Sequence, residues 1–151
     1  MKVLFLDIDG VLNRFGDENG VGATKETADG TTLIGIDRAL LTIYKTILER
    51  VDPIVVLSST WRVVPELREH LRKTGVYFHD VTPVFDPSRF LRGHEIQAWL
   101  KECAEEPRYA IIDDDSDVLP EQMPNFFRTN GEDGLTQEIA DKVTAHFGKE
   151  A

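Results

Sequence analysis

Three short apolar segments constrain the fold of this chain most: residues 3–6 (VLFL), 53–57 (PIVVL) and 109–112 (YAII). Each is apolar at successive positions, as strands buried on both faces of a parallel sheet are. Between them, apolar residues recur at helical spacing, most clearly over residues 36–51. Strands that alternate with helices predict an α/β fold with a mostly parallel sheet of about five strands.

Shorter patterns predict the remaining elements. Helices are expected from Asp37, as N-cap, to residue 51, and over residues 63–73, 92–103 and 135–147, the second ending at Gly75. Residues 76–78 predict a short third strand, and residues 125–129 a fifth. Residues 13–35 carry five glycines and few large apolar side chains, which predicts an exposed flap with a small hairpin around Gly30. We expect residues 1–151 to form a single domain with this short flap.

Acidic residues follow two of the apolar segments. Asp7 and Asp9 come after the first, and the run DDDSD, residues 113–117, comes after the last. Ligands of parallel sheets bind beyond the carboxyl ends of the strands, and positions two apart project to the same side of an extended chain. Converging carboxylates in a dry crevice favour a divalent cation, and oxygen ligands suit Mg²⁺. The plainer alternatives are a solvated Asp-Gly turn and an acid-rich helix N-terminus.

A hydroxyl group and an arginine accompany these acids. Ser58 ends the second apolar segment, where it could cap the next helix or hold a phosphate beside backbone N–H groups. Arg92 is the first residue of a predicted helix. It is either an ordinary surface residue or the fixed cation that a pocket requires when it holds a phosphate among carboxylates. Arg89 is an alternative source of that charge.

In chain order these segments resemble the motifs of the haloacid dehalogenase (HAD) superfamily of phosphohydrolases. FLDIDGVLN is similar to its first motif, VVLSS to its second and YAIIDDD to its acidic fourth, while Arg92 stands where the third motif has a basic residue, more commonly lysine. The segments SSTWR, RGHEIQAWL and IIDDDSD are also similar to small HAD domains associated with RNA-repair proteins. The resemblance implies a Rossmann-like, HAD-type three-layer sandwich without a large cap domain.

The resemblance also implies a phosphatase mechanism. Asp7 is expected to be the nucleophile that forms an aspartyl-phosphate, and Asp9 the acid and base that moves protons. Mg²⁺ is expected to bind to Asp7, to the main-chain carbonyl of Asp9 and to Asp114. Ser58 and Arg92 are expected to hold phosphoryl oxygens. A dehalogenase or phosphonatase is less favoured, because Asp9 is the residue that the phosphatases and phosphotransferases of this group share.

Five further residues are expected around this site. Asp113 and Asp117 would orient water ligands of the metal or Arg92. Ser59, Arg62 and Asn13 are expected to bind the substrate.

The substrate expected from these features is a large one. The gaps that hold caps in HAD enzymes are short here, so the site is expected to be open to a terminal phosphate on a nucleic acid or a phosphoprotein side chain, with nucleic acid favoured. The net charge of −10 repels bulk nucleic acid, so local basic groups must hold any polyanion, and Arg14, Lys25, Arg62 and Arg89 are candidates. The alternatives are a small-metabolite or nucleotide phosphatase whose flap acts as a lid, a phosphotransferase or mutase, and a non-catalytic metal- or phosphate-binding regulatory domain.

The composition predicts a monomeric cytoplasmic protein without a membrane span. The single cysteine, Cys103, excludes an intramolecular disulfide and fits a reducing compartment. No apolar run approaches the roughly 18 residues of a membrane helix, and the first apolar segment is too short for a signal peptide. The four histidines lack ligand spacing, and Trp61 and Trp99 are expected in the core rather than as stacking platforms.

Overall fold

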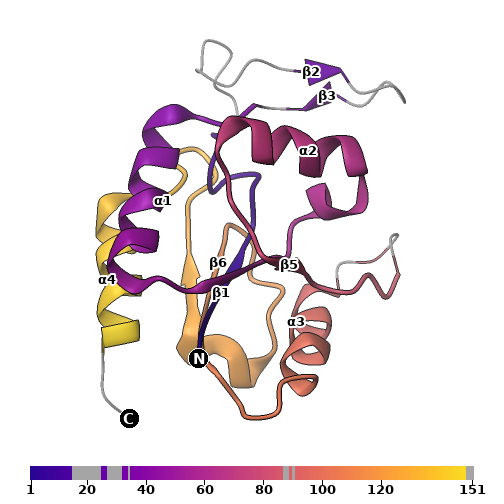
Figure 1. The fold of residues 1–151 in the computed structure, drawn as a ribbon, viewed down its shortest axis with the longest axis vertical. Helices are drawn as coiled ribbons and strands as arrows, with labels where there is room; N and C mark the ends of the chain where they lie inside the picture. The colour runs from indigo at the N-terminus through magenta and orange to yellow at the C-terminus, as the bar shows by residue number, and fades with distance from the viewer. Residues whose placement is uncertain (15–24, 27–31, 34, 87–88, 90, 149–151) are drawn as a thin grey trace.

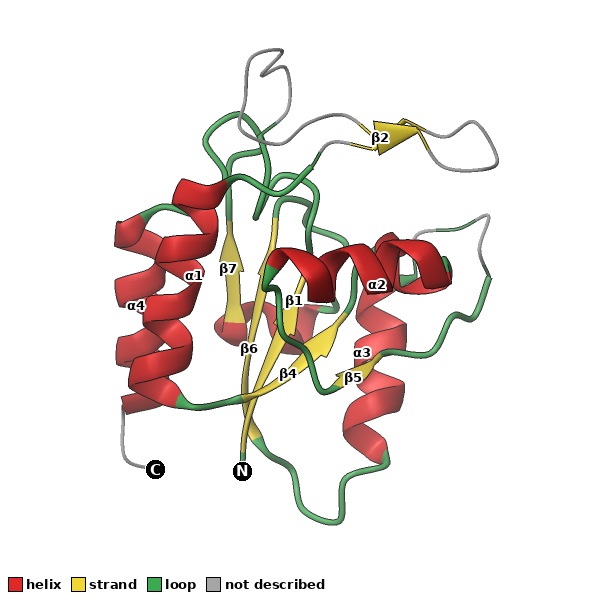
Figure 2. Cartoon of the chain, turned by 45° about the horizontal axis from the view of Figure 1, so that its top comes forward, coloured by secondary structure: helices red, strands yellow, loops and turns green. Residues whose placement is uncertain are grey.

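The central element of the fold, which Figure 1 shows as a whole, is a five-stranded parallel sheet. Its strand order is β5-β4-β1-β6-β7 (Figure 2). The computed structural model describes residues 1–14, 25–26, 32–33, 35–86, 89 and 91–148. The strands are β1 (Lys2–Leu6), β4 (Ile54–Leu57), β5 (Asp80–Val81), β6 (Arg108–Asp113) and β7 (Phe126–Arg128). The predicted α/β class and five-stranded parallel sheet are confirmed.

Helices cover both faces of this sheet, which gives three layers (Figure 2). On one face, α1 (Arg38–Val51), α2 (Pro65–Thr74) and α4 (Gln137–Gly148) pack on inward side chains such as Leu4, Leu6 and Ile112. On the other, α3 (Arg92–Lys101) packs on Phe5 and Ile111. Side chains of successive β1 residues enter opposite cores, which explains why the whole strand is apolar.

The register of the sheet brings three polar residues to one edge. Leu6 pairs with Leu57 of β4 and with Ile112 of β6. The next residue of each strand is therefore Asp7, Ser58 or Asp113, and the ladder continues through hydrogen bonds from Asp7 N–H to Ile112 O and from Ser58 N–H to Leu6 O, both 3.0 Å. The carboxyl ends of the three central strands thus place two acids and a hydroxyl group side by side.

The predicted third strand over residues 76–78 is wrong. The strand lies at β5, where Asp80 and Val81 pair with β4, and Val76 and Phe78 instead fill the core from an irregular segment. The physical reason is His79, whose imidazole Nδ1 accepts the hydrogen bond of Val55 N–H at 2.9 Å. The His79 side chain accepts the hydrogen bond that Val55 N–H would otherwise donate to a backbone carbonyl, so regular strand pairing begins only after His79.

The other predicted elements agree with the structure to within a few residues. Asp37 caps α1 by accepting from the N–H groups of residues 39 and 40, and Gly75 closes α2 in a left-handed conformation. A four-residue 3₁₀ helix, η1 (Thr60–Val63), precedes α2, and a second, η2 (Pro120–Asn125), precedes β7.

Within the predicted flap, residues 13–35, the structure describes residues 13–14 and 35 at its ends and the two strands of a hairpin. Strands β2 (Lys25–Glu26) and β3 (Thr32–Leu33) pair antiparallel, as a hairpin around Gly30 requires, and the connecting residues 27–31 lie outside the described part of the chain. Among the described residues, every helix is too short or too polar to cross a lipid bilayer.

Candidate active site

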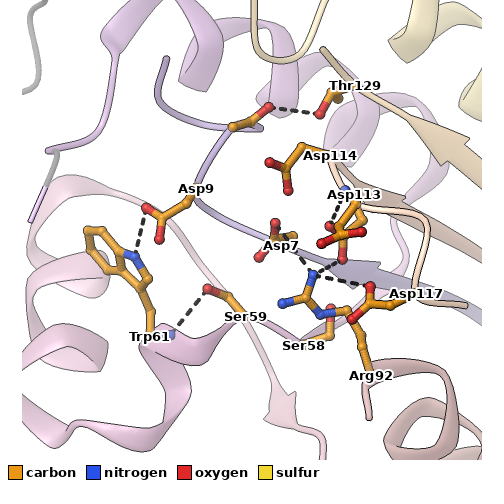
Figure 3. Close-up of polar contacts among 12 residues, drawn as sticks. Asp7, Asp9, Ser58, Ser59, Trp61, Arg92, Asp113, Asp114, Asp117 and Thr129 are labelled. Atoms are coloured by element: carbon orange, nitrogen blue, oxygen red, sulfur yellow. Dashed lines mark hydrogen bonds and ion pairs between the residues drawn. The ribbon is translucent and has the colours of Figure 1, made fainter. Parts of the chain in front are cut away.

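Asp7 occupies the centre of the polar cluster at the end of β1 (Figure 3). Only 4% of its surface is exposed, and one of its carboxylate oxygens lies 3.8 Å from Arg92 Nη1. Burial and the neighbouring charge of Asp113 raise the pKa of Asp7 well above its ordinary value, although Arg92 opposes the shift. A cation at this point would favour the ionised carboxylate.

Arg92 is held between three carboxylates at the start of α3. Its Nη1 pairs with Asp113 Oδ2, and it lies 3.8 Å from both Asp7 Oδ2 and Asp117 Oδ1. Burial alone lowers the pKa of Arg92, but the three acids outweigh it and the net direction is upward, so the guanidinium keeps its charge. Arg92 therefore provides a permanent positive charge beside Asp7.

A close backbone contact places Arg92. A Cβ on the next residue, Gly93, would lie 2.7 Å from Leu119 N, so only glycine lets α3 approach the loop that carries Asp117 so closely. The buried Gln122 ties the two segments together, because its amide donates to Gly93 O at 2.8 Å and accepts from Leu119 N–H at 2.9 Å. The start of α3 is thus fixed to the end of the β6 loop.

The carboxylates of Asp7, Asp113 and Asp114 form a cluster that could hold a metal ion, with one oxygen from each within 4.8 Å of the others. Both oxygens of Asp113 have partners, since Oδ1 accepts from Asp115 N–H at 2.9 Å and Oδ2 pairs with Arg92. Burial raises the pKa of Asp113 to about 6 despite that pairing. The oxygen-only donor set fits a hard divalent cation such as Mg²⁺, with Asp7 and Asp114 as the more available ligands.

Asp9 is oriented by two side-chain donors. Its Oδ1 accepts from Trp61 Nε1 at 3.0 Å (Figure 3). The same oxygen accepts from Asn13 Nδ2, also at 3.0 Å. Asn13 also accepts from Gly10 N–H at 2.9 Å, which closes the turn after β1. Both donors meet Oδ1, so the acid–base role predicted for Asp9 would fall to Oδ2.

The turn at Gly10 connects the first and last acidic segments. Gly10 has φ +79°, and a Cβ there would lie 2.7 Å from Asp114 Oδ2. Its carbonyl accepts from the buried hydroxyl of Thr129 at 2.7 Å, while Thr129 N–H donates to Asp113 O. Glycine is therefore required at position 10 both for the positive φ and for the close approach of Asp114. Thr129 joins this turn to the loop after β6.

The hydroxyl groups at the end of β4 differ in their surroundings. Ser58 is fully buried, and its Oγ has no hydrogen-bond partner among the described residues. A buried hydroxyl without a partner is costly, and it is a group that a phosphoryl oxygen could satisfy. Ser59 Oγ instead accepts from Trp61 N–H at 3.2 Å and caps η1.

Comparison with known proteins agrees with this arrangement. A family model described as the HAD domain in Swiss Army Knife RNA repair proteins matches residues 3–140. The chain belongs to this HAD family. No curated protein shows a significant sequence match.

Two solved structures share the HAD-type fold. A chain from Legionella pneumophila, assigned to subfamily III A of the HAD superfamily hydrolases, is 17% identical with a TM-score of 0.51, over 99% of this chain and 85% of its own. A hypothetical protein from Xanthomonas campestris is 16% identical with a TM-score of 0.51, over 97% of this chain and 82% of its own. At these identities the likeness extends to the fold alone.

The structure brings together most of the residues predicted for the site of this HAD domain. Asp7, Ser58, Arg92, Asp113 and Asp117 lie in one cluster. Asp9 and Asp114 flank it, and Asn13 and Ser59 hold the adjoining turns. The roles of all these residues remain predictions.

Arg62 differs from the other predicted substrate-binding residues. It is buried, and all five of its N–H donors are used, by the carbonyls of residues 58, 59, 82 and 83 and by Glu95 at 2.9 Å. These contacts assign it to holding the loops after β4 and β5 rather than to a free position for a ligand.

The four candidate basic groups are also distributed unequally. Arg14 forms an ion pair with Asp37 at 3.0 Å, and the side chain of Lys25 lies outside the described part of the structure. Arg89 lines a cavity that Arg92 also lines. Of these two candidates for the phosphate-binding cation, Arg92 is the one that lies against Asp7.

Sequence reasoning missed Thr129, Gln122, Arg128 and the hydrogen bond of Trp61. Arg128 lines a second hollow, of about 430 Å³, together with Asp114 and Thr129. The basic residue beside acidic Asp114 is separated from it by 14 positions in the chain, and only strand pairing of β6 with β7 makes them neighbours.

Proposed function

We propose that this HAD domain is a Mg²⁺-dependent phosphatase that removes a terminal phosphate from a nucleic acid through an aspartyl-phosphate. One observation carries the proposal. The buried carboxylate of Asp7 lies 3.8 Å from Arg92, beside a buried Ser58 hydroxyl that lacks a partner and within a cluster of three carboxylates. This set contains a nucleophile, two groups for phosphoryl oxygens and ligands for a cation.

The charge balance of the site supports a metal. Arg92 pairs with Asp7, Asp113 and Asp117, and Asp9 and Asp114 add two further carboxylates beside them, so a phosphate dianion would meet net repulsion. Mg²⁺, when bound, would offset this repulsion and polarise the phosphoryl group. Asp7, Asp114 and the main-chain carbonyl of Asp9 are the groups that we expect to hold it.

The chain's own residues supply the two chemical steps. In the first, a carboxylate oxygen of Asp7 attacks phosphorus, the bond to the leaving oxygen breaks, and Asp9 gives that oxygen a proton. In the second, Asp9 removes a proton from water, the water oxygen attacks phosphorus, and the bond to Asp7 breaks to release inorganic phosphate. Ser58 and Arg92 hold phosphoryl oxygens in both steps.

Two features favour a nucleic-acid end as the substrate. The family to which the chain belongs is named for HAD domains in RNA repair proteins. Arg89 and Arg128 line hollows that share Arg92 or Asp114 with the site, so backbone phosphates near a chain end could meet a cation. Two such contacts predict a shallow dependence of binding on salt, with a slope of about two counterions.

The test is a panel of phosphomonoesters assayed with Mg²⁺: oligonucleotides phosphorylated at the 3′ or 5′ end, mononucleotides, sugar phosphates, phosphopeptides and an aryl phosphate. We expect hydrolysis that EDTA abolishes and that Asp7→Asn reduces at least about a thousandfold. Asp115→Asn, a change to an exposed acid in the neighbouring loop, is the matched control and should remain active.

Two results would contradict the proposal. Full turnover by Asp7→Asn would remove the nucleophile assignment. A clear preference for a sugar phosphate over phosphorylated oligonucleotides would point to a small-metabolite phosphatase, and inactivity on every ester with Mg²⁺ still bound would point to a regulatory domain.

A further inference from the structure

A cavity of about 280 Å³ adjoins the polar cluster. It lies between η1, the start of α3 and the segment that joins β5 to α3. Most of its lining surface is apolar and includes Val63, Val64, Val84 and Leu91, while charged residues such as Asp86 and Arg89 also line it. Val63 is 49% exposed and Val84 40% exposed, so these two side chains stand at its mouth. An apolar wall of this kind is not a surface that a phosphate or a free sugar would select.

The cavity shares residues with the proposed phosphate site. Arg92 and Asp117 line it, and the same Arg92 guanidinium lies 3.8 Å from Asp7 Oδ2. The cavity and the proposed phosphate site therefore meet at Arg92, from which a group attached to the phosphate could extend into the cavity. The space is thus available to the leaving group of the substrate.

Polar groups at its two ends restrict the ligand further. Both oxygens of the Asp117 carboxylate are buried and lack a hydrogen-bond partner among the described residues, beyond the 3.8 Å ion pair with Arg92. They could accept from a hydroxyl or amino group. Arg89 lies elsewhere on the lining, and a guanidinium can stack on a base or bond to its edge.

The size limits the ligand to one unit. Pockets for drug-sized ligands occupy roughly 300–1,000 Å³, and 280 Å³ is just below that range. A single nucleoside has the required combination of a flat apolar face, hydroxyl donors and a polar edge. The ring of a phosphotyrosine would fill the apolar part but would offer Asp117 no donor.

Resting on the function proposed above, we propose that this cavity binds the terminal nucleoside of the substrate, with the base against Val63, Val64, Val84 and Leu91 and the sugar toward Asp117. The enzyme would then recognise a chain end by its phosphate and one unpaired base, and the rest of the nucleic acid would extend into solvent. A duplex end would have to fray to fill the cavity.

The test uses Asp7→Asn with Mg²⁺, so that binding is measured without turnover. Calorimetry compares 3′- and 5′-mononucleotides with ribose 5-phosphate and phosphotyrosine. We expect the better mononucleotide to bind about tenfold or more tightly than ribose 5-phosphate, as contact with one base typically provides. Adding Val84→Trp fills the mouth and should abolish this difference while leaving ribose 5-phosphate affinity within about twofold.

Met123→Trp is the matched control, because it adds the same bulk at a position that is 52% exposed and does not line the cavity. It should keep the preference for the base. Equal binding of nucleotide and ribose phosphate would overturn the inference, as would an equal loss of both in Val84→Trp or tighter binding of phosphotyrosine.

A kinetic comparison separates this inference from the function on which it rests. Wild-type enzyme is assayed on end-phosphorylated oligonucleotides whose terminal residue is either normal or abasic. Lower kcat/KM on the abasic end supports the cavity assignment, and equal kcat/KM on both overturns it while leaving the phosphatase intact. Absence of hydrolysis on both substrates would refute the proposed function. The binding comparison would then still test whether the cavity binds a nucleoside.

Discussion

The indole Nε1 of Trp61 donates to Asp9 Oδ1 over 3.0 Å, across 52 positions of the chain. Trp61 is 1% exposed, so it is the core residue that its sequence predicts, and its polar edge also reaches the candidate acid. Together with Asn13 it occupies one oxygen of Asp9, and the proposed mechanism assigns the other oxygen to the leaving group. Trp61 is therefore a candidate positioning residue.

Trp61→Phe should lower turnover more on esters with poor leaving groups than on good ones. The variant keeps an aromatic ring in the core but removes the donor, so Asp9 loses one of two orienting bonds. We expect kcat on an alkyl phosphate to fall about tenfold or more, since proton transfer typically contributes about 10²–10⁴-fold. An aryl phosphate that leaves without protonation should lose much less, and KM should change little.

Trp99→Phe is the control for this prediction, because the Trp99 indole donates to the exposed Asp80 at 2.9 Å, away from the site. It should be active on both esters. Equal losses on both esters in Trp61→Phe would indicate a packing role only.

Substitutions of Asp9 and of Asp114 are predicted to have different effects, the first on proton transfer and the second on metal binding. Asp9→Asn should bind Mg²⁺ normally and turn over about 10²–10⁴-fold more slowly, because the expected metal contact is its main-chain carbonyl. Asp114→Asn should instead weaken Mg²⁺ binding about tenfold or more, since it removes a charged ligand. Titration of Mg²⁺ against activity and against thermal stability measures both, and the reverse ranking would exchange the two roles.

Arg62 is predicted to affect stability before it affects substrate binding. Arg62→Lys keeps the charge near Glu95 but has three N–H donors in place of five, so two of the five acceptors lose their donor, at about 1–2 kcal/mol each. We expect the free energy of unfolding to fall by about 2–4 kcal/mol. Chemical denaturation measures this, with the exposed Arg89→Lys as control. A raised KM with unchanged stability would restore Arg62 to the substrate site.

The sequence predicts the centre of the site well because adjacent strands position it. Asp7, Ser58 and Asp113 each follow a segment that is apolar at every position, and the register of a parallel sheet must bring such strand ends together. These inferences need only burial and periodicity. Arg92 needs more, because the start of a helix also suits a surface arginine, and its resemblance to the third HAD motif favours it over Arg89.

The supporting contacts could not be predicted in this way. Thr129 donates to Gly10 O across 119 positions, and Gln122 joins α3 to the β6 loop by two backbone bonds. A sequence indicates that a residue is buried, but not which distant polar group it will meet. The misplaced third strand has the same origin, since nothing local shows that the His79 ring will take the place of a backbone acceptor.

The stability of the metal-free protein should fall as pH rises through about 6. Burial raises the pKa of Asp113 from 3.8 to about 6 and that of Asp7 in the same direction, so between these values the folded state binds more protons than the unfolded state. By linkage the free energy of unfolding then decreases as pH rises from about 4 through about 6, and it is level below about pH 4.

Thermal denaturation in EDTA across pH 4–8 measures this slope. Asp113→Asn should flatten it, and Asp115→Asn, at an exposed position, should not. Mg²⁺ should stabilise most at the upper end of the range, where the ligands are ionised. A metal-free protein that becomes more stable toward pH 8 would contradict the assigned charges.

Gly10 is predicted to control both the turn and the position of Asp114, the proposed metal ligand. Gly10→Ala forces a side chain into φ +79° and 2.7 Å from Asp114 Oδ2. The strained backbone should lower the free energy of unfolding by about 1–2 kcal/mol, and displacement of the Asp114 carboxylate should weaken Mg²⁺ binding by about tenfold. Gly75→Ala provides the matched control, because Gly75 has φ +93° but its nearest neighbour to an added Cβ is Lys45 Nζ, at 3.6 Å. It should lose similar stability with unchanged Mg²⁺ affinity, as calorimetry with the metal can show. Equal Mg²⁺ affinities in the two variants would mean that Asp114 tolerates displacement, and the assignment of Asp114 as a ligand would then fail.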